Sequence, residues 1–577
     1  MGAVFICISN LFAIFPAQVI RKSLDAVQRA LENNTEHSAL LSSEIVSKLF
    51  LFGVIILAAA ILKGIFMFLM RQTIIVMSRH IEYDLKNEMY AHYQKLSTSF
   101  YKKNNTGDLM ARISEDISRV RMYVGPAIMY FIQMLTLFSF TITAMFLVNV
   151  KLTLCVLIPL PVLSLVIYYV SNRINKKSDK VQSQLSKLVT LTQETFSGIR
   201  ILKSFAREEA MFAKYEKESI EYKNESLSLS KIEAFYAPSM TVLIGLSMLF
   251  AVYYGGNQVI KGEISIGNIA EFVYYINMLT WPVASVGWVS SLVQRAAASQ
   301  ERINTFLRTE PEIANPINEK LHLNGAIDFK NVSFTYPETG IKALKNISFT
   351  VEPGEAIGII GRTGSGKSTI ANLITRLYDA IEGEISIDYQ KINELNISEL
   401  RKNIGYVPQD VFLFSDTIAN NILFGKHGLN EIPKENIEQV AKDAYIYNNI
   451  MELPEKFETY IGERGVTLSG GQKQRVSIAR AIIGSPKILV FDDCLSAVDT
   501  ETEDIILNNL KRLMQGKTTV IISHRVSSVK HANKIIVLES GEILEQGKHD
   551  DLLKQRGLYY SLYSKQLLED KKTNKDR

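Results

Sequence analysis

A glycine-rich loop at residues 361–368 carries the clearest chemistry in the sequence. It reads Gly-Arg-Thr-Gly-Ser-Gly-Lys-Ser and lies between the strand-like run 356–360 and the apolar, helix-like run 369–378. Glycines let successive backbone N–H groups surround phosphate oxygens at a helix N-terminus, while the lysine reaches the outer phosphates and the serine can ligate magnesium. The pattern therefore predicts a nucleoside triphosphate site formed by Gly361, Arg362, Thr363, Gly364, Ser365, Gly366, Lys367, Ser368 and Thr369.

Two adjacent aspartates extend this prediction. Asp492 and Asp493 end the apolar run 488–491, which is typical of a buried parallel strand. Ligand sites in α/β sheets lie at the carboxyl ends of strands, so both carboxylates are expected beside the glycine-rich loop. We predict that Asp492 holds magnesium through water, together with Ser368, and that Asp493 faces the water that attacks the terminal phosphate.

Further polar residues follow predicted strands or precede a predicted helix. Residues 468–472, Leu-Ser-Gly-Gly-Gln, place a hydroxyl group and bare amides at the start of a helix, where an anion is favoured. Gln409 and His524 follow apolar strand-like runs, and Tyr336 lies 25 residues before the loop, where its ring can stack on an adenine. Their order and spacing predict further site residues, namely Tyr336, Gln409, Ser469, Gly470, Gly471, Gln472 and His524.

The N-terminal half has the pattern of a membrane domain. A helix needs about 20 apolar residues to cross a bilayer. Six segments qualify, at roughly 3–22, 48–70, 122–148, 152–171, 235–260 and 268–293. Only residues 149–151 join the third and fourth, which predicts a tight antiparallel hairpin. Lys63 interrupts the second span, and we expect it to face a neighbouring helix or a water-filled cavity.

The loop charges predict the orientation. Residues 71–121 hold nine Lys and Arg, and residues 171–231 hold twelve, whereas the opposite connections hold one each, Lys151 and Lys261. Basic loops stay in the cytoplasm, so an even number of spans places both termini and the C-terminal half there. Both basic loops are too long for turns, and their spaced hydrophobic residues predict helices that continue beyond the bilayer.

Composition narrows the alternatives. A net charge of +5 on 577 residues is too small to imply a nucleic-acid partner, and three cysteines provide no disulfide framework. The apolar start is expected to be a retained span rather than a signal peptide, because no basic region precedes it. Two prolines and mixed charges predict a linker at 308–325, between a transmembrane domain (1–307) and a nucleotide-binding domain (326–577).

The segment Leu468–Gln472, placed between a phosphate loop and an aspartate-ending strand, resembles the signature of ABC ATPases. The order of six spans, linker and nucleotide-binding domain is similar to that of half-size ABC exporters, and the likeness covers essentially the whole chain. This resemblance implies a membrane all-α domain of six transmembrane helices followed by an α/β P-loop ABC ATPase domain. It also implies ATP and Mg²⁺ as cofactors.

The resemblance also implies residue roles. Tyr336 stacks on the adenine, Gln409 senses the γ-phosphate and magnesium, and His524 is the switch histidine. The implied catalytic residues are Asp493, His524 and Gln409, and the implied metal ligands are Ser368, Gln409 and Asp492. Residues 463–465 match an exporter-specific segment and residues 496–499 match the D-loop. Two further segments, around 101–109 and 202–209, fall where such proteins place their coupling helices.

In this family two ATP molecules lie between two ATPase domains. Each ATP is held by the phosphate loop of one domain and by the amides that correspond to Ser469–Gly471 in the other domain. The expected partner is therefore a second half-exporter subunit. The implied function is ATP-driven export of an amphiphilic drug, lipid or peptide-like substrate across the cytoplasmic (inner) membrane by alternating access. A homodimeric lipid flippase and an ATP-gated channel or regulatory ABC protein are the alternatives. Six spans exclude a soluble ABC ATPase, and fusion of spans to ATPase disfavours an importer.

Two departures from the family pattern stand out. The given sequence starts directly with the first apolar segment, without the short amphipathic helix that usually precedes it, and a late start or a truncated chain would explain this. The residue after Asp492 is aspartate where glutamate is usual. A weak site at Asp493 is tolerable if the partner subunit carries the glutamate, so a heterodimer is favoured. The switch histidine is retained, however, which leaves a slow homodimer open.

Overall fold

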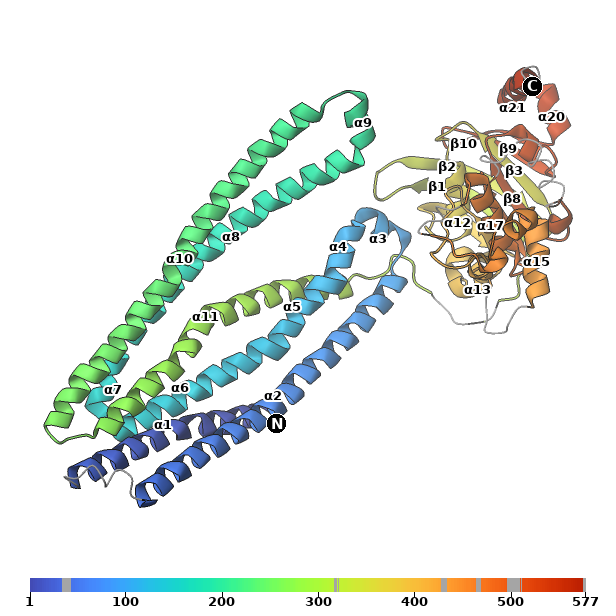
Figure 1. The fold of residues 1–577 in the computed structure, drawn as a ribbon. Coiled ribbons are helices and arrows are strands. Elements are labelled where there is room, and N and C mark those ends of the chain that lie inside the picture. Colours follow the sequence, from blue (N-terminus) through green and yellow to red (C-terminus); the bar gives the residue numbers. More distant parts are fainter. Residues whose placement is uncertain are drawn as a thin grey trace. The chain divides into compact units, whose positions relative to one another are not determined.

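The computed structural model describes residues 1–33, 43–315, 319, 321–426, 433–462, 468–494, 509 and 511–573. The chain divides into two compact units, which we describe separately (Figure 1). The membrane unit comprises residues 1–92 and 107–309, and the nucleotide unit comprises residues 93–106 and 310–577. Residues 93–106 thus group with the C-terminal half, although they lie inside the predicted transmembrane domain.

Six helical segments in the described residues are long and apolar enough to cross a membrane, which confirms the predicted number. Each is much longer than the ~20 residues that a bilayer requires, so the predicted helical extensions beyond the bilayer are confirmed. The single helices are α1 (Gly2–Asn33), α2 (Ser43–Lys95), α10 (Glu208–Ile260) and α11 (Ile266–Leu307). Two spans are composite. The third consists of α4 (Thr106–Ala111), the π-turn η2 (Arg112–Asp116), α5 (Ile117–Met122), the π-turn η3 (Tyr123–Ala127) and α6 (Ile128–Val148). The fourth consists of α7 (Val150–Leu157) and α8 (Pro159–Ser197).

The connections match their sequence signals. Asn149 alone separates α6 from α7, and its side-chain oxygen caps α7 by accepting a hydrogen bond from the Leu152 N–H at 2.9 Å. The helix is interrupted between α7 and α8 at Ile158, although Ile158 itself keeps a helical backbone (φ −52°, ψ −44°). The interruption arises because Pro159 and Pro161 have no N–H with which to continue the helical hydrogen bonds. At their far ends, α8 and α10 are joined through the short helix α9 (Ile199–Ser204), and they lie side by side (Figure 1).

Charged side chains also join the membrane helices. Glu271 of α11 is fully buried and accepts a hydrogen bond from Arg21 of α1 at 3.0 Å and another from the Tyr275 hydroxyl at 2.8 Å. Lys177 of α8 pairs with Glu225 of α10 at 2.9 Å. The desolvated Glu271 carboxylate is stable only because such partners satisfy it, so this pair holds α1 beside α11, whereas Lys177 and Glu225 are both partly exposed.

The nucleotide unit contains two sheets. The larger has the order β10-β9-β3-β8-β7-β6, and its strands are parallel except for β10, which runs antiparallel to β9. The smaller sheet is antiparallel, with the order β2-β1-β4-β5. The strands are β1 (Ile327–Thr335), β2 (Lys342–Val351), β3 (Ala356–Gly361), β4 (Glu382–Ile387), β5 (Gln390–Lys391), β6 (Ile404–Val407), β7 (Ile488–Asp492), β8 (Thr518–Ser523), β9 (Lys534–Glu539) and β10 (Glu542–Gly547).

Both faces of the larger sheet are buried in separate hydrophobic cores. Along β7, Leu489 and Phe491 belong to one core, which also contains α17 (Gly470–Ile482), whereas Ile488 and Val490 belong to the other. That second core contains α12 (Lys367–Ile374) and the smaller sheet. Burial on both faces explains why these strands are uniformly apolar in sequence. The helices of the nucleotide unit not yet named are α3 (Thr98–Lys103), α13 (Ile397–Lys402), α14 (Ile418–Leu423), α15 (Lys434–Asp443), α16 (Tyr447–Met451), α19 (Val526–Val529), α20 (His549–Gln555) and α21 (Leu558–Thr573).

Candidate nucleotide site

The glycine-rich loop connects the end of β3 to the start of α12, in the strand–loop–helix arrangement that its sequence predicts. Gly364 and Gly366 adopt left-handed backbone conformations, with φ of +80° and +99°. A Cβ on Gly366 would lie 2.4 Å from the carbonyl oxygen of Ala343, so only glycine fits there. The Ser365 hydroxyl is buried without a hydrogen-bond partner in the described part of the chain, as suits a group that binds a ligand oxygen.

Lys367 points back across this loop. Its Nζ donates hydrogen bonds of 2.9 Å to the carbonyl oxygens of Gly361 and Arg362 and lies 3.5 Å from Nδ1 of His524. Burial lowers the pKa of Lys367 to about 8, while the nearby carboxylates of Asp493 and Asp492 act in the opposite direction. A buried ammonium of this kind is stabilised by any further negative charge that enters the loop.

Asp492 and Ser368 form an oxygen pair at the end of β7. The Ser368 hydroxyl donates to the Asp492 carboxylate at 3.0 Å. The pKa of Asp492 is raised to about 6, mainly by burial and also by Asp493, although Ser368 and Lys367 act in the opposite direction. Among the described residues no cluster of three metal-binding side chains occurs. One carboxylate and one hydroxyl fit Mg²⁺ nonetheless, because this ion completes its shell with water and phosphate oxygens.

Asp493 occupies a constrained position beside the loop. It has a left-handed φ of +47°, and its N–H donates to the Ile522 carbonyl at 2.8 Å. Its carboxylate accepts a 3.4 Å contact from the backbone N–H of His524. The side chain is buried, so the positions of both Asp493 and His524 are set by the ends of β7 and β8.

The predicted residues meet in one cavity of about 410 Å³ at the carboxyl edge of the larger sheet. Four strands deliver them: β3 leads to the loop, β6 to Gln409, β7 to the two aspartates and β8 to His524. Burial lowers the pKa of His524, and Lys367 lowers it further. The predicted residues that line the cavity are Tyr336, Thr363, Gly364, Ser365, Gly366, Lys367, Ser368, Thr369, Gln409, Asp492, Asp493 and His524.

Tyr336 lines this cavity and is held by Thr369, which the sequence predicts as a site residue, and by Tyr378 and Lys102, which it does not. Its hydroxyl lies 3.0 Å from the Thr369 hydroxyl, and its ring packs edge-on against Tyr378. Lys102 of α3 places its ammonium 4.9 Å from the centre of the Tyr336 ring. No pattern near residue 102 points to Tyr336, because this contact depends on the chain's long-range folding.

Six predicted residues do not line the cavity. Gly361 and Arg362 precede the part of the loop that faces it, and the Arg362 side chain is largely exposed. Ser469 and Gln472 instead form a capping box at the start of α17, where each side chain accepts a hydrogen bond from the other's backbone N–H, at 3.3 and 2.9 Å. Gly470 and Gly471 lie in that same first turn, away from the chain's own loop. Residues 463–465 and 496–499 lie outside the described residues.

The fold and site define a P-loop ATPase joined to a six-helix membrane domain. Residues 1–283 match the family model of the ABC transporter transmembrane region, and residues 344–496 match the ABC transporter model. The chain belongs to the ABC transporter family. It is a multi-pass membrane protein with an ATPase coupled to transport, and half-transporters of this kind work as dimers.

Several known proteins are similar over most of their length. The uncharacterized ABC transporter ATP-binding protein YknU of Bacillus subtilis is 38% identical over 85% of this chain and 84% of its own. The multidrug resistance-like ATP-binding protein MdlA of Escherichia coli is 35% identical over 85% and 83%. The ATP-dependent lipid A-core flippase of Pseudomonas fluorescens is 35% identical over 88% and 84%. The solved structure of a bacterial Atm1-family ABC exporter with ATP bound matches with a TM-score of 0.80 and 26% identity, covering 98% of this chain and 97% of that one.

Alanine at Gly366 should disrupt ATP binding far more than alanine at Gly364. Both glycines have positive φ, so each substitution strains the backbone by roughly 1–2 kcal/mol. Only the Gly366 methyl meets the Ala343 carbonyl, whereas the Gly364 methyl meets nothing within 4 Å. Titration of the purified variants with a fluorescent ATP analogue should show an affinity loss of more than about tenfold for Gly366→Ala, against a few-fold for Gly364→Ala. Equal affinities would contradict the close packing described here.

Proposed function

We propose that this chain is one half of an exporter that uses ATP to move an amphiphilic substrate out across the cytoplasmic membrane. The observation that carries the proposal is the convergence of Lys367, Asp492, Asp493, Gln409 and His524 at one sheet edge of a chain with six spanning-length helices. The proposed organisation is a transmembrane domain at 1–307, a linker at 308–325 and a nucleotide-binding domain at 326–577.

The proposed roles follow from the geometry. The loop from Gly361 to Thr369 binds the phosphates of ATP through its N–H groups, and Lys367 neutralises their charge. Ser368, Asp492 and Gln409 are placed to hold Mg²⁺, which would supply charge neutralisation at the β- and γ-phosphates when bound. Asp493 orients the attacking water and His524 contacts the γ-phosphate, while Tyr336 stacks on the adenine.

The signature residues are assigned to the ATP of the partner subunit. Ser469, Gly470, Gly471 and Gln472 are absent from the chain's own cavity, yet they begin a 13-residue helix whose first-turn N–H groups favour an anion. A γ-phosphate bound between two such domains would join them, and hydrolysis would remove the joining charge. That change is the ligand-controlled shift between two packings on which alternating access depends.

An amphiphilic substrate is supported by a cavity within the membrane unit. A hollow of about 260 Å³ lies between α8 and α11, and Gly287 lets Ser171 approach closely there, since an added Cβ would lie 3.1 Å from the Ser171 hydroxyl. Its lining combines hydroxyl, amide and aliphatic side chains, including Ser290, Asn172 and Val283. Two relatives are named a multidrug resistance-like protein and a lipid A-core flippase, and drugs and lipids combine polar and apolar parts in the same way.

Lys367→Ala tests the proposed ATPase. The substitution removes the buried ammonium but leaves the two hydrophobic cores of the nucleotide unit intact. We expect normal membrane insertion with loss of vanadate-sensitive ATP hydrolysis and of transport, measured on protein purified without any wild-type partner. Wild-type turnover in that preparation would refute the proposed site.

The proposed topology places both termini and the extensions of α2, α8 and α10 in the cytoplasm. Asn175 on α8 and Lys261 after α10 are both exposed, so a single cysteine at either position can react. In a background lacking Cys7, Cys155 and Cys494, a membrane-impermeant thiol reagent should label the cysteine at position 261 in intact cells and spare the one at position 175. The reverse pattern would overturn the orientation and the direction of transport.

We further propose that the partner is a different half-exporter whose site carries a glutamate. Asp493 is one methylene shorter than glutamate, which withdraws the carboxylate by about one carbon–carbon bond, ~1.5 Å. Misplacement of this size can cost on the order of 100-fold in rate. The intact signature of this chain could instead complete a fully competent site on the partner subunit.

Asp493→Glu separates the two assemblies. In a homodimer limited by this residue, the purified chain should hydrolyse ATP at least severalfold faster, because the longer side chain restores the reach toward water. In a heterodimer, the chain purified from its native cell should bring a second half-exporter with it. Stable dimers of this chain alone, with full transport and no such partner, would end the heterodimer proposal.

A further inference from the structure

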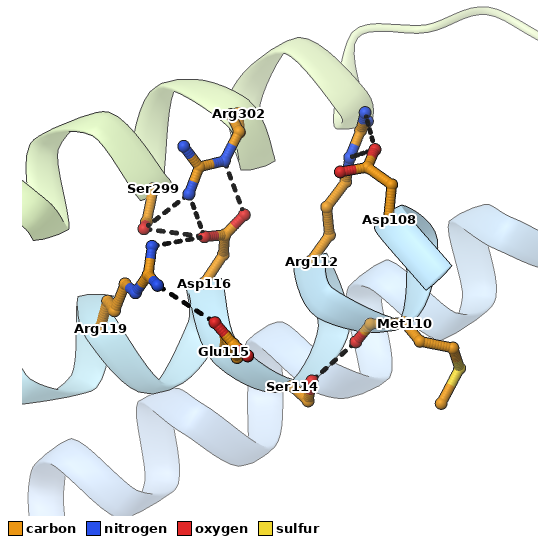
Figure 2. Close-up of polar contacts among 9 residues, drawn as sticks. All are labelled: Asp108, Met110, Arg112, Ser114, Glu115, Asp116, Arg119, Ser299 and Arg302. Carbon is orange, nitrogen blue, oxygen red and sulfur yellow. Dashed lines mark hydrogen bonds and ion pairs between the residues drawn. The ribbon is translucent and has the colours of Figure 1, made fainter. Parts of the chain in front are cut away.

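A buried aspartate lies inside a π-helical turn of the third membrane segment. Asp116 closes η2 and is only 4% exposed, whereas the two residues before it, Ser114 and Glu115, are exposed (Figure 2). π-Turns insert one extra residue into a helix and are frequent at functional sites, since they rotate side chains away from their regular directions. Asp116 is not part of the nucleotide site, so its burial needs a separate explanation.

The Asp116 carboxylate is held by α11. Arg302 approaches it with two nitrogens: its Nε donates to Oδ2 at 2.9 Å and its Nη2 donates to Oδ1. The fully buried Ser299 hydroxyl adds a third hydrogen bond to Oδ1 at 2.8 Å, and Arg119 lies 3.8 Å away (Figure 2). Paired donors from one guanidinium fix direction as well as distance, so this contact sets the register of α11 against η2 and α5.

Two ion pairs near Asp116 are exposed and lie within one helical segment, unlike the pair of Asp116 with Arg302. Glu115 pairs with Arg119 at 3.1 Å and Asp108 with Arg112 at 2.6 Å, and both pairs are four residues apart on one helical segment. Glu115 and Asp108 are more than half exposed, so solvent screens these pairs and they join no two helices. Asp116 alone among these three carboxylates reaches across to α11 (Figure 2).

Other contacts extend the connection to α2. Arg121 of α5 lies 3.4 Å from Glu82 of α2, and both side chains are largely buried. In the second π-turn, η3, a Cβ on Gly125 would meet the Ser78 hydroxyl of α2 at 2.7 Å, so glycine permits a close approach there. Ala127, at the end of η3, packs against Val289 and Leu292 of α11. The two π-turns therefore join α2, the third segment and α11 into one packed group.

We propose that Asp116 and Arg302 form a clamp that makes α2, α5 and α11 move as a single body, so that the displacement driven by ATP reaches the membrane part of α11. Chain connectivity supports this role: α2 and α4 flank the short helix α3, and Arg302 lies five residues before the end of α11, after which the linker begins. This inference rests on the proposed function, because it concerns the coupling between the ATP site and the spans.

Asp116 is a positioning residue in this scheme, and its burial is explained by specificity. An apolar pair would cost less desolvation, but it would hold the two helices in less defined register. The Arg302 side chain is 45% exposed and can be hydrated when its partner loses charge. Asp116→Asn therefore removes the ionic clamp without leaving a buried, unpaired charge, and the variant is expected to fold.

The chain has a natural reporter for this movement. Its two tryptophans, Trp281 and Trp288, both lie on α11, and each ring is 5.4 Å from Tyr130 of α6. Intrinsic fluorescence thus reports on α11 within the membrane, while ATP hydrolysis reports on the nucleotide unit. Purified protein, together with any native partner, is reconstituted in phosphatidylethanolamine–phosphatidylglycerol liposomes. Tryptophan fluorescence is measured before and after trapping with Mg-ATP and vanadate. Basal ATP hydrolysis is measured on the same liposomes.

The wild type should respond to trapping with a fluorescence change. Asp116→Asn should keep its basal ATPase within about twofold, but its fluorescence response should be about tenfold smaller, since contacts between coupled elements carry much of the coupling. Glu115→Gln, which makes the same chemical change on the adjacent exposed residue, should match the wild type in both measurements. Arg302→Lys keeps the charge but lacks the paired donors, so it should also lose most of the response.

Three outcomes would overturn the clamp: a wild-type response in Asp116→Asn, a proportional fall of ATPase and response in that variant, or no response in a wild type that hydrolyses ATP. If Asp116→Asn cannot be purified, the same criteria apply to Arg302→Lys. Failure of the proposed function would look different, because the wild type itself would then lack vanadate-sensitive ATPase.

Discussion

The burial of one ammonium beside two carboxylates constrains the whole nucleotide unit. Lys367, Asp492 and Asp493 are each less than a tenth exposed, and they come from a helix start and a strand end that only a parallel sheet brings together. Desolvation lowers the pKa of Lys367 and raises that of Asp492, so both groups are energetically poised for compensating charge. A bound phosphate would supply negative charge to Lys367, and a bound divalent cation would supply positive charge to Asp492. The glycine backbone, both hydrophobic cores and the sheet order can be understood as the framework that holds these three groups together.

In the proposed assembly, a second chain completes this site. The cavity offers donors to phosphates from one side, while the first turn of α17 carries its free amides elsewhere in the nucleotide unit. The Ser469–Gln472 capping box rigidifies that turn before any ligand arrives, which lowers the ordering cost of binding an anion there. A half-site and a prepared helix start on the same chain suit a dimer of two half-exporters, since each subunit can then complete the site of the other.

Much of this could be predicted because the decisive residues are contiguous or follow recognisable strands. The phosphate loop, the aspartate pair and the six apolar spans depend on local sequence, and the sheet edge then brings Gln409 and His524 to the same place. Contacts between distant segments were not predictable in this way. Lys102 meets Tyr336 only because α3 packs within the nucleotide unit, and Asp116, at the end of the π-turn η2, meets Arg302 only because α11 packs against this segment. The sequence predicts Ser469 and Gln472 as site residues at a helix start, and the structure adds that their side chains cap that helix.

The polar contacts of the membrane unit follow a common physical logic. Glu271 with Arg21, and Asp116 with Arg302, each place a buried carboxylate on one helix and its cation on another. Apolar packing alone lets helices slide and rotate at small cost, whereas a paired, desolvated charge allows one register. Both pairs involve α11, which passes from the buried Glu271 near its start to Arg302 close to the linker. A helix fixed in register at both ends transmits displacement along its length instead of absorbing it by rotation. This is the mechanical property that a transporter needs in the helix connecting its membrane domain to its ATPase.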